Sequence, residues 1–169
     1  MTSRTATLVG TGLIGGSIGL ALRRAGWQVV GTDRDPDRAR AAVERGALDD
    51  VGEDPASDLT IVAIPVGGIV GEVQRLGAAG HGVITDVGSV KGPVLAGIDH
   101  PQFVGGHPMA GSEQDGIGAA DPDLFEGATW VLTPTSSTDD RAYDAVRAAI
   151  VELGAEVVAL EPERHDALV

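Results

Sequence analysis

Two patterns of apolar residues alternate along the chain. Short continuous apolar runs are typical of strands buried in a parallel sheet, whereas apolar residues spaced three or four positions apart are typical of helices packed on it. The predicted strands lie at residues 5–9, 28–33, 59–64, 83–86, 103–105, 129–133 and 156–160. Helices are predicted at residues 13–25, between the cap Asp35 and the stop Gly46, and at residues 139–153, with a further helix start at residues 161–163.

This alternation predicts an α/β fold, namely a Rossmann-like, doubly wound and mostly parallel sheet. The length of 169 residues suits one domain with a full core. Because aromatic residues make up only 3% of the chain, the core must consist mainly of Val, Ile, Leu and Ala. We expect residues 1–160 to form this domain, and residues 161–169 to begin a linker or helix that leads to a further segment.

The charge and composition narrow the classes of partner. A formal net charge of -13 argues against nucleic acid and against anionic membrane surfaces. No apolar run is long enough to span a bilayer. The chain has no cysteine, which excludes disulfides, a thiolate zinc site and a thiol nucleophile, and we expect no metal site. This composition fits a cytoplasmic protein that binds small molecules.

A glycine pattern follows the first predicted strand and opens the first predicted helix. In the sequence GTGLIG at residues 10–15, Gly10 allows a tight turn, Gly12 allows close approach of a pyrophosphate, and Gly15 allows the helix to pack closely on the strand. The free N–H groups of the helix N-terminus favour phosphate. The residues expected to bind the dinucleotide here are Gly10, Gly12, Leu13, Ile14 and Gly15.

An acidic residue ends the second predicted strand, at the position where a carboxylate binds the ribose 2'-hydroxyl of NAD. This residue is Asp33, and its charge disfavours the 2'-phosphate of NADP. Arg34 weakens the argument, because a guanidinium can stack on adenine or bind that phosphate. We therefore expect NAD, with NADP less favoured.

Two further segments leave strands at the same edge of the sheet, where ligands bind in such folds. Ala63, Ile64 and Pro65 are expected beside the cofactor, although Pro65 could serve only to end the strand. The segment 86–91 follows the next strand and places Asp86 near the cofactor, with the Ser89 hydroxyl and the Lys91 ammonium close to the nicotinamide. The alternative is that Asp86 or Ser89 caps a helix and Lys91 is a solvated charge.

The most distinctive polar stretch is GGHPMAGSE at residues 105–113. It places a histidine, a hydroxyl and a carboxylate among glycines and a proline, a composition that disfavours regular structure. His107 follows a strand at the cofactor edge, and an imidazole can move a proton at neutral pH. Its role is therefore predicted to be acid–base catalysis, whereas His81 and His100 fall in polar turns and are expected at the surface.

The chain resembles the prephenate dehydrogenase family of tyrosine biosynthesis, which includes arogenate-using enzymes. The segments that carry the resemblance are GTGLIGGS at 10–17, DVGSVK at 86–91, GGHPMAGSEQDG at 105–116, Leu124-Phe125, TWVLTP at 129–134 and His165-Asp166. The glycine fingerprint is generic, but the histidine segment after Asp-x-Gly-Ser-x-Lys is highly specific. The resemblance covers essentially the whole chain.

The resemblance implies that prephenate is oxidatively decarboxylated by NAD(P)+ to 4-hydroxyphenylpyruvate and CO2. It also implies that His107 takes the proton of the ring hydroxyl and that Ser89 orients His107 and reaches the same hydroxyl. Ser112, Glu113 and Lys91 are expected to line the substrate pocket. The family continues into an all-helical domain that dimerises and supplies an arginine for the substrate carboxylate; we expect that domain to be absent here, so that this chain binds NAD but turns over poorly.

Three alternatives stay open at this point. The substrate could be arogenate, because prephenate and arogenate differ only by a keto or an amino group on the side chain. A 3-hydroxy acid dehydrogenase on the same fold would leave the segment around His107 unexplained. The third alternative is a non-catalytic nucleotide-binding module, such as a sensor.

Overall fold

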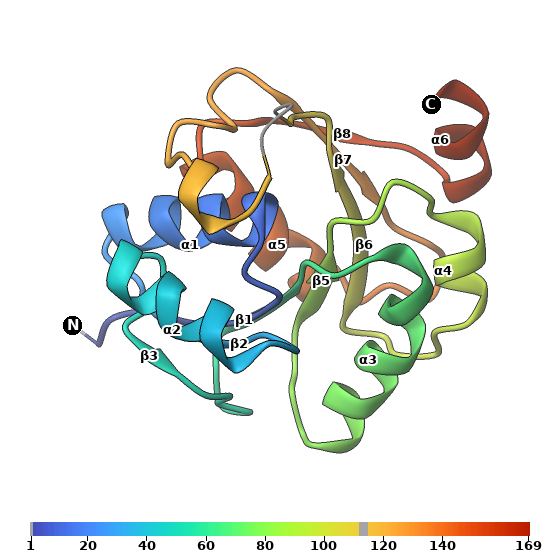
Figure 1. Cartoon of the computed structure of the whole chain (residues 1–169). Helices are drawn as coiled ribbons and strands as arrows, with labels where there is room; N and C mark the ends of the chain where they lie inside the picture. The colour runs from blue at the N-terminus through green and yellow to red at the C-terminus, as the bar shows by residue number, and fades with distance from the viewer. Residues whose placement is uncertain (1, 112–114) are drawn as a thin grey trace.

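The computed structural model describes residues 2–111 and 115–169 and shows one sheet of eight strands covered by helices on both faces (Figure 1). The strand order is β3-β2-β1-β4-β5-β6-β7-β8. The strands are β1 (Thr5–Val9), β2 (Gln28–Thr32), β3 (Asp50–Val51), β4 (Leu59–Val62), β5 (Ile84–Asp86), β6 (Phe103–Pro108), β7 (Thr129–Thr133) and β8 (Glu156–Ala159). The helices are α1 (Leu13–Arg24), α2 (Pro36–Arg45), α3 (Val66–Ala78), α4 (Gly92–Ala96), a 3-10 turn η1 (Ile117–Ala119), α5 (Asp140–Glu152) and α6 (Pro162–Leu168).

The expected doubly wound, mostly parallel sheet is confirmed. Every strand pair is parallel except β6 with β7, where Gly105 lies opposite Thr133 and His107 lies opposite Val131. The caps of α2 also agree with the sequence: the Asp35 side chain accepts a hydrogen bond from Asp37 N, and Gly46 ends the helix in a left-handed conformation. The short strand β3 and the helices α3 and α4 were not among the expected elements.

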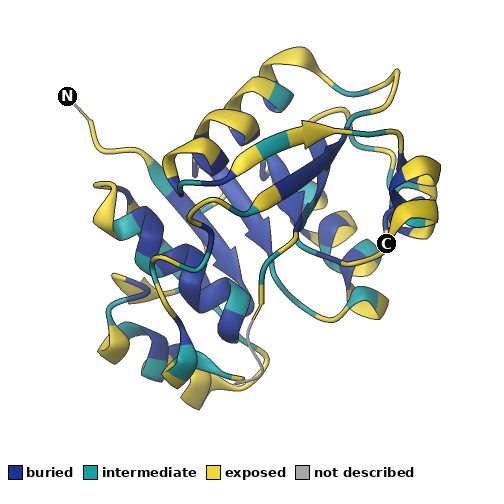
Figure 2. Ribbon diagram, turned by 90° about the horizontal axis from the view of Figure 1, so that it is seen from above, coloured by how far each residue is buried: buried dark blue, intermediate teal, exposed yellow. Residues whose placement is uncertain are grey.

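The sheet separates two apolar layers, and its central strands are deeply buried, whereas the edge strands β3 and β8 are mostly exposed (Figure 2). Consecutive residues of a strand point to opposite faces, so Leu8 packs under α1, α2 and α5 while Val9 packs under α3 and α4. Both layers consist mainly of Val, Ile, Leu and Ala, as the composition predicts. Among the described residues, no helix is long and apolar enough to cross a membrane.

The turn from β1 to α1 is packed so closely that it requires glycine at two positions. Gly10 has a φ of +96°, and a Cβ there would lie 2.1 Å from the carbonyl oxygen of Ala63. A Cβ on Gly15 would lie 2.0 Å from the carbonyl oxygen of Gly10. This contact brings α1 against the turn and directs the helix N-terminus toward the carboxyl edge of the sheet.

We expect Gly15→Ala to lower the free energy of unfolding by about 1–3 kcal/mol, because the methyl group has no room against Gly10. The matched control is Gly71→Ala in the exposed part of α3, where a Cβ meets no atom within 4 Å. There alanine should stabilise the chain by about 0.5–1 kcal/mol through its better helix propensity. Urea denaturation measures both changes, and equal effects of the two substitutions would contradict the packing argument.

Candidate active site

An open cleft of about 620 Å³ lies at the carboxyl ends of β1, β4 and β5. Eight of the residues that the sequence places at the cofactor or the substrate line it, namely Gly12, Leu13, Ile14, Gly15, Ala63, Ile64, Pro65 and Ser89. Six more lining residues were not named individually as site residues from the sequence, namely Val66, Val87, Gly88, Ala110, Gly111 and Asp115. All but Val66 lie within the segments 86–91 and 105–116 that the sequence analysis quoted, and Val66 directly follows Pro65.

The N-terminus of α1 opens into this cleft and is suited to phosphate. Its first turn contains no acidic residue, and no side chain caps it. A Cβ on Gly12 would meet no atom within 4 Å, so the backbone there borders open space. A helix end with free N–H groups and a positive dipole attracts anions. The residues present therefore fit the pyrophosphate of a dinucleotide.

Asp33 lies just past the end of β2, next to the glycine turn. Its carboxylate accepts hydrogen bonds from Thr11 N (2.9 Å), Thr11 Oγ1 (2.8 Å) and Asp35 N (2.9 Å). Partial burial opposes ionisation of Asp33, but these hydrogen bonds outweigh it and the pKa lies below its ordinary value of 3.8. An ionised carboxylate is thus fixed beside the dinucleotide cleft, with the exposed Arg34 next to it.

His107 lies within β6 rather than after a strand, because β6 extends to Pro108 and pairs there with β7. The ring hydrogen bond found for His107 joins its Nδ1 to Nε2 of His165, at 2.8 Å. This ring nitrogen is therefore bonded to a residue of α6, and Ser89 is exposed at the cleft, so the orienting role expected for Ser89 stays a prediction. The two imidazole planes are nearly perpendicular, at 81°.

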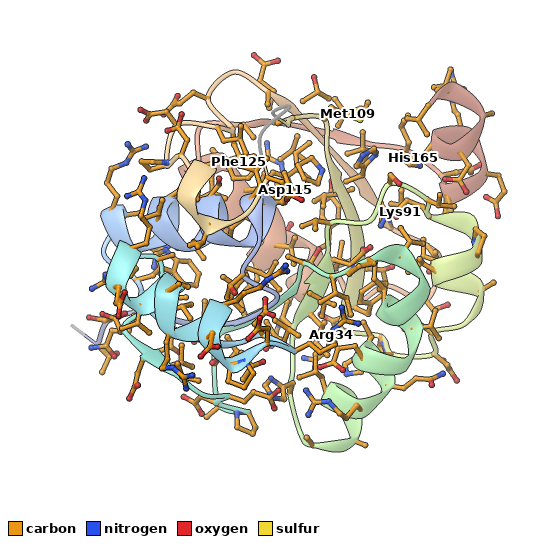
Figure 3. The ribbon with its side chains drawn as sticks, viewed as in Figure 1. Arg34, Lys91, Met109, Asp115, Phe125 and His165 are labelled. Carbon is orange, nitrogen blue, oxygen red and sulfur yellow. The ribbon has the colours of Figure 1, made fainter. Side chains whose placement is uncertain are left out.

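The histidine pair is extended by hydrogen bonds to the partly exposed carboxylate of Asp166. Nδ1 of His165 is 2.7 Å from Oδ1 of Asp166, and the Asp166 carboxylate also accepts hydrogen bonds from the backbone N–H groups of Lys91 (2.8 Å) and Gly92 (2.7 Å). Asp166 thereby caps the N-terminus of α4 from a distant helix. In Figure 3 the labelled side chains of Lys91 and His165 lie close to α4 and α6.

Lys91 and Asp86 form an ion pair whose side chains are both 0% exposed. Burial raises the pKa of Asp86 and lowers the pKa of Lys91, while their mutual contact opposes both shifts. Asp86 also accepts hydrogen bonds from Gly88 N and Gly106 N, each 3.0 Å long. The expected contacts of Lys91 with substrate and of Asp86 with cofactor are therefore corrected, because both side chains are enclosed and bind each other.

The environment of His107 keeps it neutral. Burial, together with the neighbouring His165 and Lys91, lowers the pKa of His107 from 6.5 to about 4. A neutral imidazole has one nitrogen that accepts a proton, and Ala110 and Gly111, shortly after His107 in the chain, line the cleft. This arrangement places a proton acceptor close to the segment that borders the candidate dinucleotide site.

Three other residues named from the sequence are Ser112, Glu113 and His81. Ser112 and Glu113 lie outside the described residues. His81 is buried, contrary to expectation, and its Nδ1 is 2.8 Å from Thr60 Oγ1.

The role of His165-Asp166 could not be decided from the sequence. Nothing in the local sequence shows that His165, which lies 58 positions after His107, contacts it. In the described part of the chain, no group of three or more His, Asp or Glu side chains could bind a metal ion.

Comparison with known proteins gives a consistent result. A family model described as prephenate dehydrogenase, nucleotide-binding domain, matches residues 18–159. Prephenate dehydrogenase of Bacillus subtilis (strain 168) is 38% identical over 177 aligned positions, which cover 96% of this chain and 48% of the relative. The chain thus spans about half the length of the curated relatives it matches.

Solved structures agree with this assignment. The structure of Aquifex aeolicus prephenate dehydrogenase with hydroxyphenyl propionate and NAD+ has a TM-score of 0.90 and 30% identity, covering 99% of this chain and 63% of that one. Synechocystis arogenate dehydrogenase has a TM-score of 0.88 and 32% identity, covering 98% of this chain and 62% of that one. The glycine turn, the cleft beside it and the match over most of the sequence lead to one conclusion: the chain belongs to the prephenate dehydrogenase family and contains its nucleotide-binding domain.

Proposed function

We propose that this chain supplies the dinucleotide site and the proton acceptor for NAD-dependent oxidative decarboxylation of prephenate. The observation that carries the proposal is a neutral histidine, His107, whose strand leads into the lining of a cleft at a glycine-rich helix start. We propose that residues 1–160 form the functional domain. The dimer and the cytoplasmic location expected from the sequence are part of the same proposal for the whole protein.

The reaction needs a base and an electron acceptor. Bound NAD+ would accept the hydride from the ring carbon that carries the hydroxyl group. His107 would receive the hydroxyl proton as that carbon becomes oxidised. The bond from the ring to its carboxylate breaks, CO2 leaves, and the released electron pair makes the ring aromatic. The proton taken by His107 returns to the phenol oxygen, so the products are 4-hydroxyphenylpyruvate, CO2 and NADH.

The other proposed roles follow from position. The exposed Ser89 hydroxyl lines the cleft and is proposed to contact the substrate hydroxyl. Ser112 and Glu113 are proposed to contact the substrate from the segment that follows the cleft-lining Gly111. Gly10, Leu13 and Ile14 would shape the pyrophosphate site, while Ala63, Ile64 and Pro65 would form its wall.

Arogenate is a second candidate substrate. The observation in its favour is the 32% identity to Synechocystis arogenate dehydrogenase, which lies in the same range as the 30% identity to the Aquifex aeolicus prephenate dehydrogenase. Both substrates carry the same ring hydroxyl and ring carboxylate, so the role proposed for His107 is the same. Assays with the two compounds in parallel distinguish the candidates.

We expect wild-type chain to bind NAD+ more tightly than NADP+, and Asp33→Asn to weaken NAD+ binding by roughly tenfold. The substitution removes an ionised acceptor for the ribose hydroxyl, and the net contribution of a hydrogen bond to a charged group is about 1.5–3 kcal/mol, of which the low end corresponds to about tenfold. The substitution should also reduce the preference for NAD+ over NADP+, because the negative charge that repels the 2'-phosphate is lost. Calorimetric titration measures both affinities.

The control for this titration is Asp37→Asn, which changes an exposed carboxylate in the first turn of α2 and should leave both affinities unchanged. Equal affinity of the wild type for NAD+ and NADP+, unaffected by Asp33→Asn, would contradict the assignment of Asp33.

We expect the free energy of unfolding to fall as the pH is lowered from about 6.5 to about 4, in part because of His107. The unfolded chain binds a proton on this imidazole near pH 6.5, whereas the folded chain binds it only near pH 4. In His107→Asn this contribution is absent, so stability should depend less steeply on pH in that window. Urea denaturation at several pH values measures it; a slope equal to that of wild type would refute the neutral state of His107.

In the whole protein, we expect His107→Asn to lower kcat for NADH formation from prephenate by about 10²–10⁴-fold, the range for loss of a general base. The affinity for NAD+ should stay near the wild-type value, because the side chain is not among those lining the glycine cleft. His100→Gln, on the loop before β6, is the matched control. A near-normal rate for His107→Asn, followed by NADH absorbance, would remove His107 from the reaction.

A further inference from the structure

Three side chains from two distant segments form a continuous hydrogen-bonded chain that ends at His107. Asp166 Oδ1 is 2.7 Å from His165 Nδ1, and His165 Nε2 is 2.8 Å from His107 Nδ1. His165 is fully buried, whereas His107 is only partly buried. The sequence resemblance left the role of His165-Asp166 undecided, and the contacts of this pair show what it can do.

The direction of each hydrogen bond follows from the fixed donors around Asp166. Its carboxylate already accepts from the backbone N–H groups of Lys91 and Gly92, which cannot reverse their role. Burial disfavours the ionised form, but these bonds outweigh it and the pKa of Asp166 lies below its ordinary value. Since a carboxylate only accepts, Nδ1 of His165 must carry the proton in that contact.

The position of the proton on His165 then determines which nitrogen of His107 is protonated. A neutral His165 that is protonated on Nδ1 has an unprotonated Nε2, which can only accept. His107 must therefore donate from Nδ1, and its own Nε2 is left unprotonated. This is the nitrogen that a general base needs, and it is the one not used in the contact with His165.

We propose that His165 and Asp166 are positioning residues that fix His107 as its Nδ1–H tautomer and keep Nε2 ready to accept a proton. The assignment of the tautomer stands on these contacts together with a neutral form of the fully buried His165. Only the identity of the proton, that of the substrate hydroxyl, rests on the function proposed above.

The same chain also balances the charge that appears when His107 takes up a proton. The proton enters at Nε2, while Nδ1 keeps its proton and its bond to His165 Nε2. The imidazolium then faces the ionised Asp166 through His165, in the way that a carboxylate stabilises the imidazolium of a catalytic triad through a single hydrogen bond. The nearby Lys91 ammonium acts in the opposite direction and lowers the pKa of His107, although Lys91 is paired with Asp86.

The competing arrangement has a protonated His165 that donates from Nε2 to His107 Nδ1. His107 would then carry its proton on Nε2, and no nitrogen of the ring would be free to act as a base. The two arrangements differ in which nitrogen of His107 is protonated, and this is directly measurable.

The test is long-range ¹H–¹⁵N NMR of the histidine side chains in the 169-residue chain at pH 7, without dinucleotide or substrate. We expect Nδ1 of His107 to resonate as a protonated nitrogen and Nε2 as an unprotonated one, with the Nδ1–H form in about tenfold or greater excess (about 1.4 kcal/mol). A predominant Nε2–H form in the wild type would overturn the proposal.

Two substitutions at one position separate positioning from packing. His165→Gln keeps an acceptor, the side-chain carbonyl, and should retain the Nδ1–H form of His107. His165→Leu keeps an apolar volume without an acceptor, and the excess of the Nδ1–H form should fall by about tenfold or more. An unchanged ratio in His165→Leu would overturn the role of His165, and if that variant does not fold, the wild type and His165→Gln still decide.

His100→Gln serves as the control that should leave His107 unchanged. Because these spectra need neither cofactor nor turnover, they can support the tautomer even if dehydrogenase activity is not found. Conversely, an active enzyme whose His107 carries its proton on Nε2 would refute this inference and leave the proposed reaction standing.

Discussion

The arrangement of the site depends on the buried carboxylate of Asp86. It ends β5 and accepts three hydrogen bonds, from Gly88 N, Gly106 N and the ammonium of Lys91. Gly88 and Lys91 belong to the segment between β5 and α4, and Gly106 belongs to β6, so one carboxylate ties this segment and β6 to the end of β5. Burying a carboxylate is costly unless it is fully paired, and removing either charge of a buried pair typically costs about 3–5 kcal/mol. The pair therefore constrains where β6, and with it His107, can lie.

The elements that the sequence predicted well are those whose own residues determine them. The strand at 5–9 and the helix between Asp35 and Gly46 have local apolar patterns, a capping carboxylate and a left-handed glycine, and all of these were confirmed. The helix α3 was not predicted, because seven of its thirteen residues are glycine or valine, which are poor helix formers, and only a few positions such as Ile69 and Leu76 are buried. Its stability comes from packing on the sheet, which local propensity does not report.

The site residues also differ in whether the sequence alone could locate them. The glycine turn and Asp33 could be located from spacing alone, because backbone geometry dictates where they lie relative to the first two strands. Lys91 and Asp86 could not, because a charged pair five positions apart looks solvated in the sequence and is enclosed only after β6 and α4 cover it. His165 was beyond such reasoning for a different reason: its partner is set by where α6 docks, a tertiary property with no periodic signal.

The cap that Asp166 places on α4 has a consequence for the order in which the molecule is assembled during synthesis. The sheet uses no residue after Ala159, and the dinucleotide cleft uses none after Asp115, so both can form before residues 162–168 dock. The orientation of His107 must wait for residues 162–168 to emerge and dock. A nascent chain can thus form the nucleotide-binding surface before residues 162–168 contact His107 and α4.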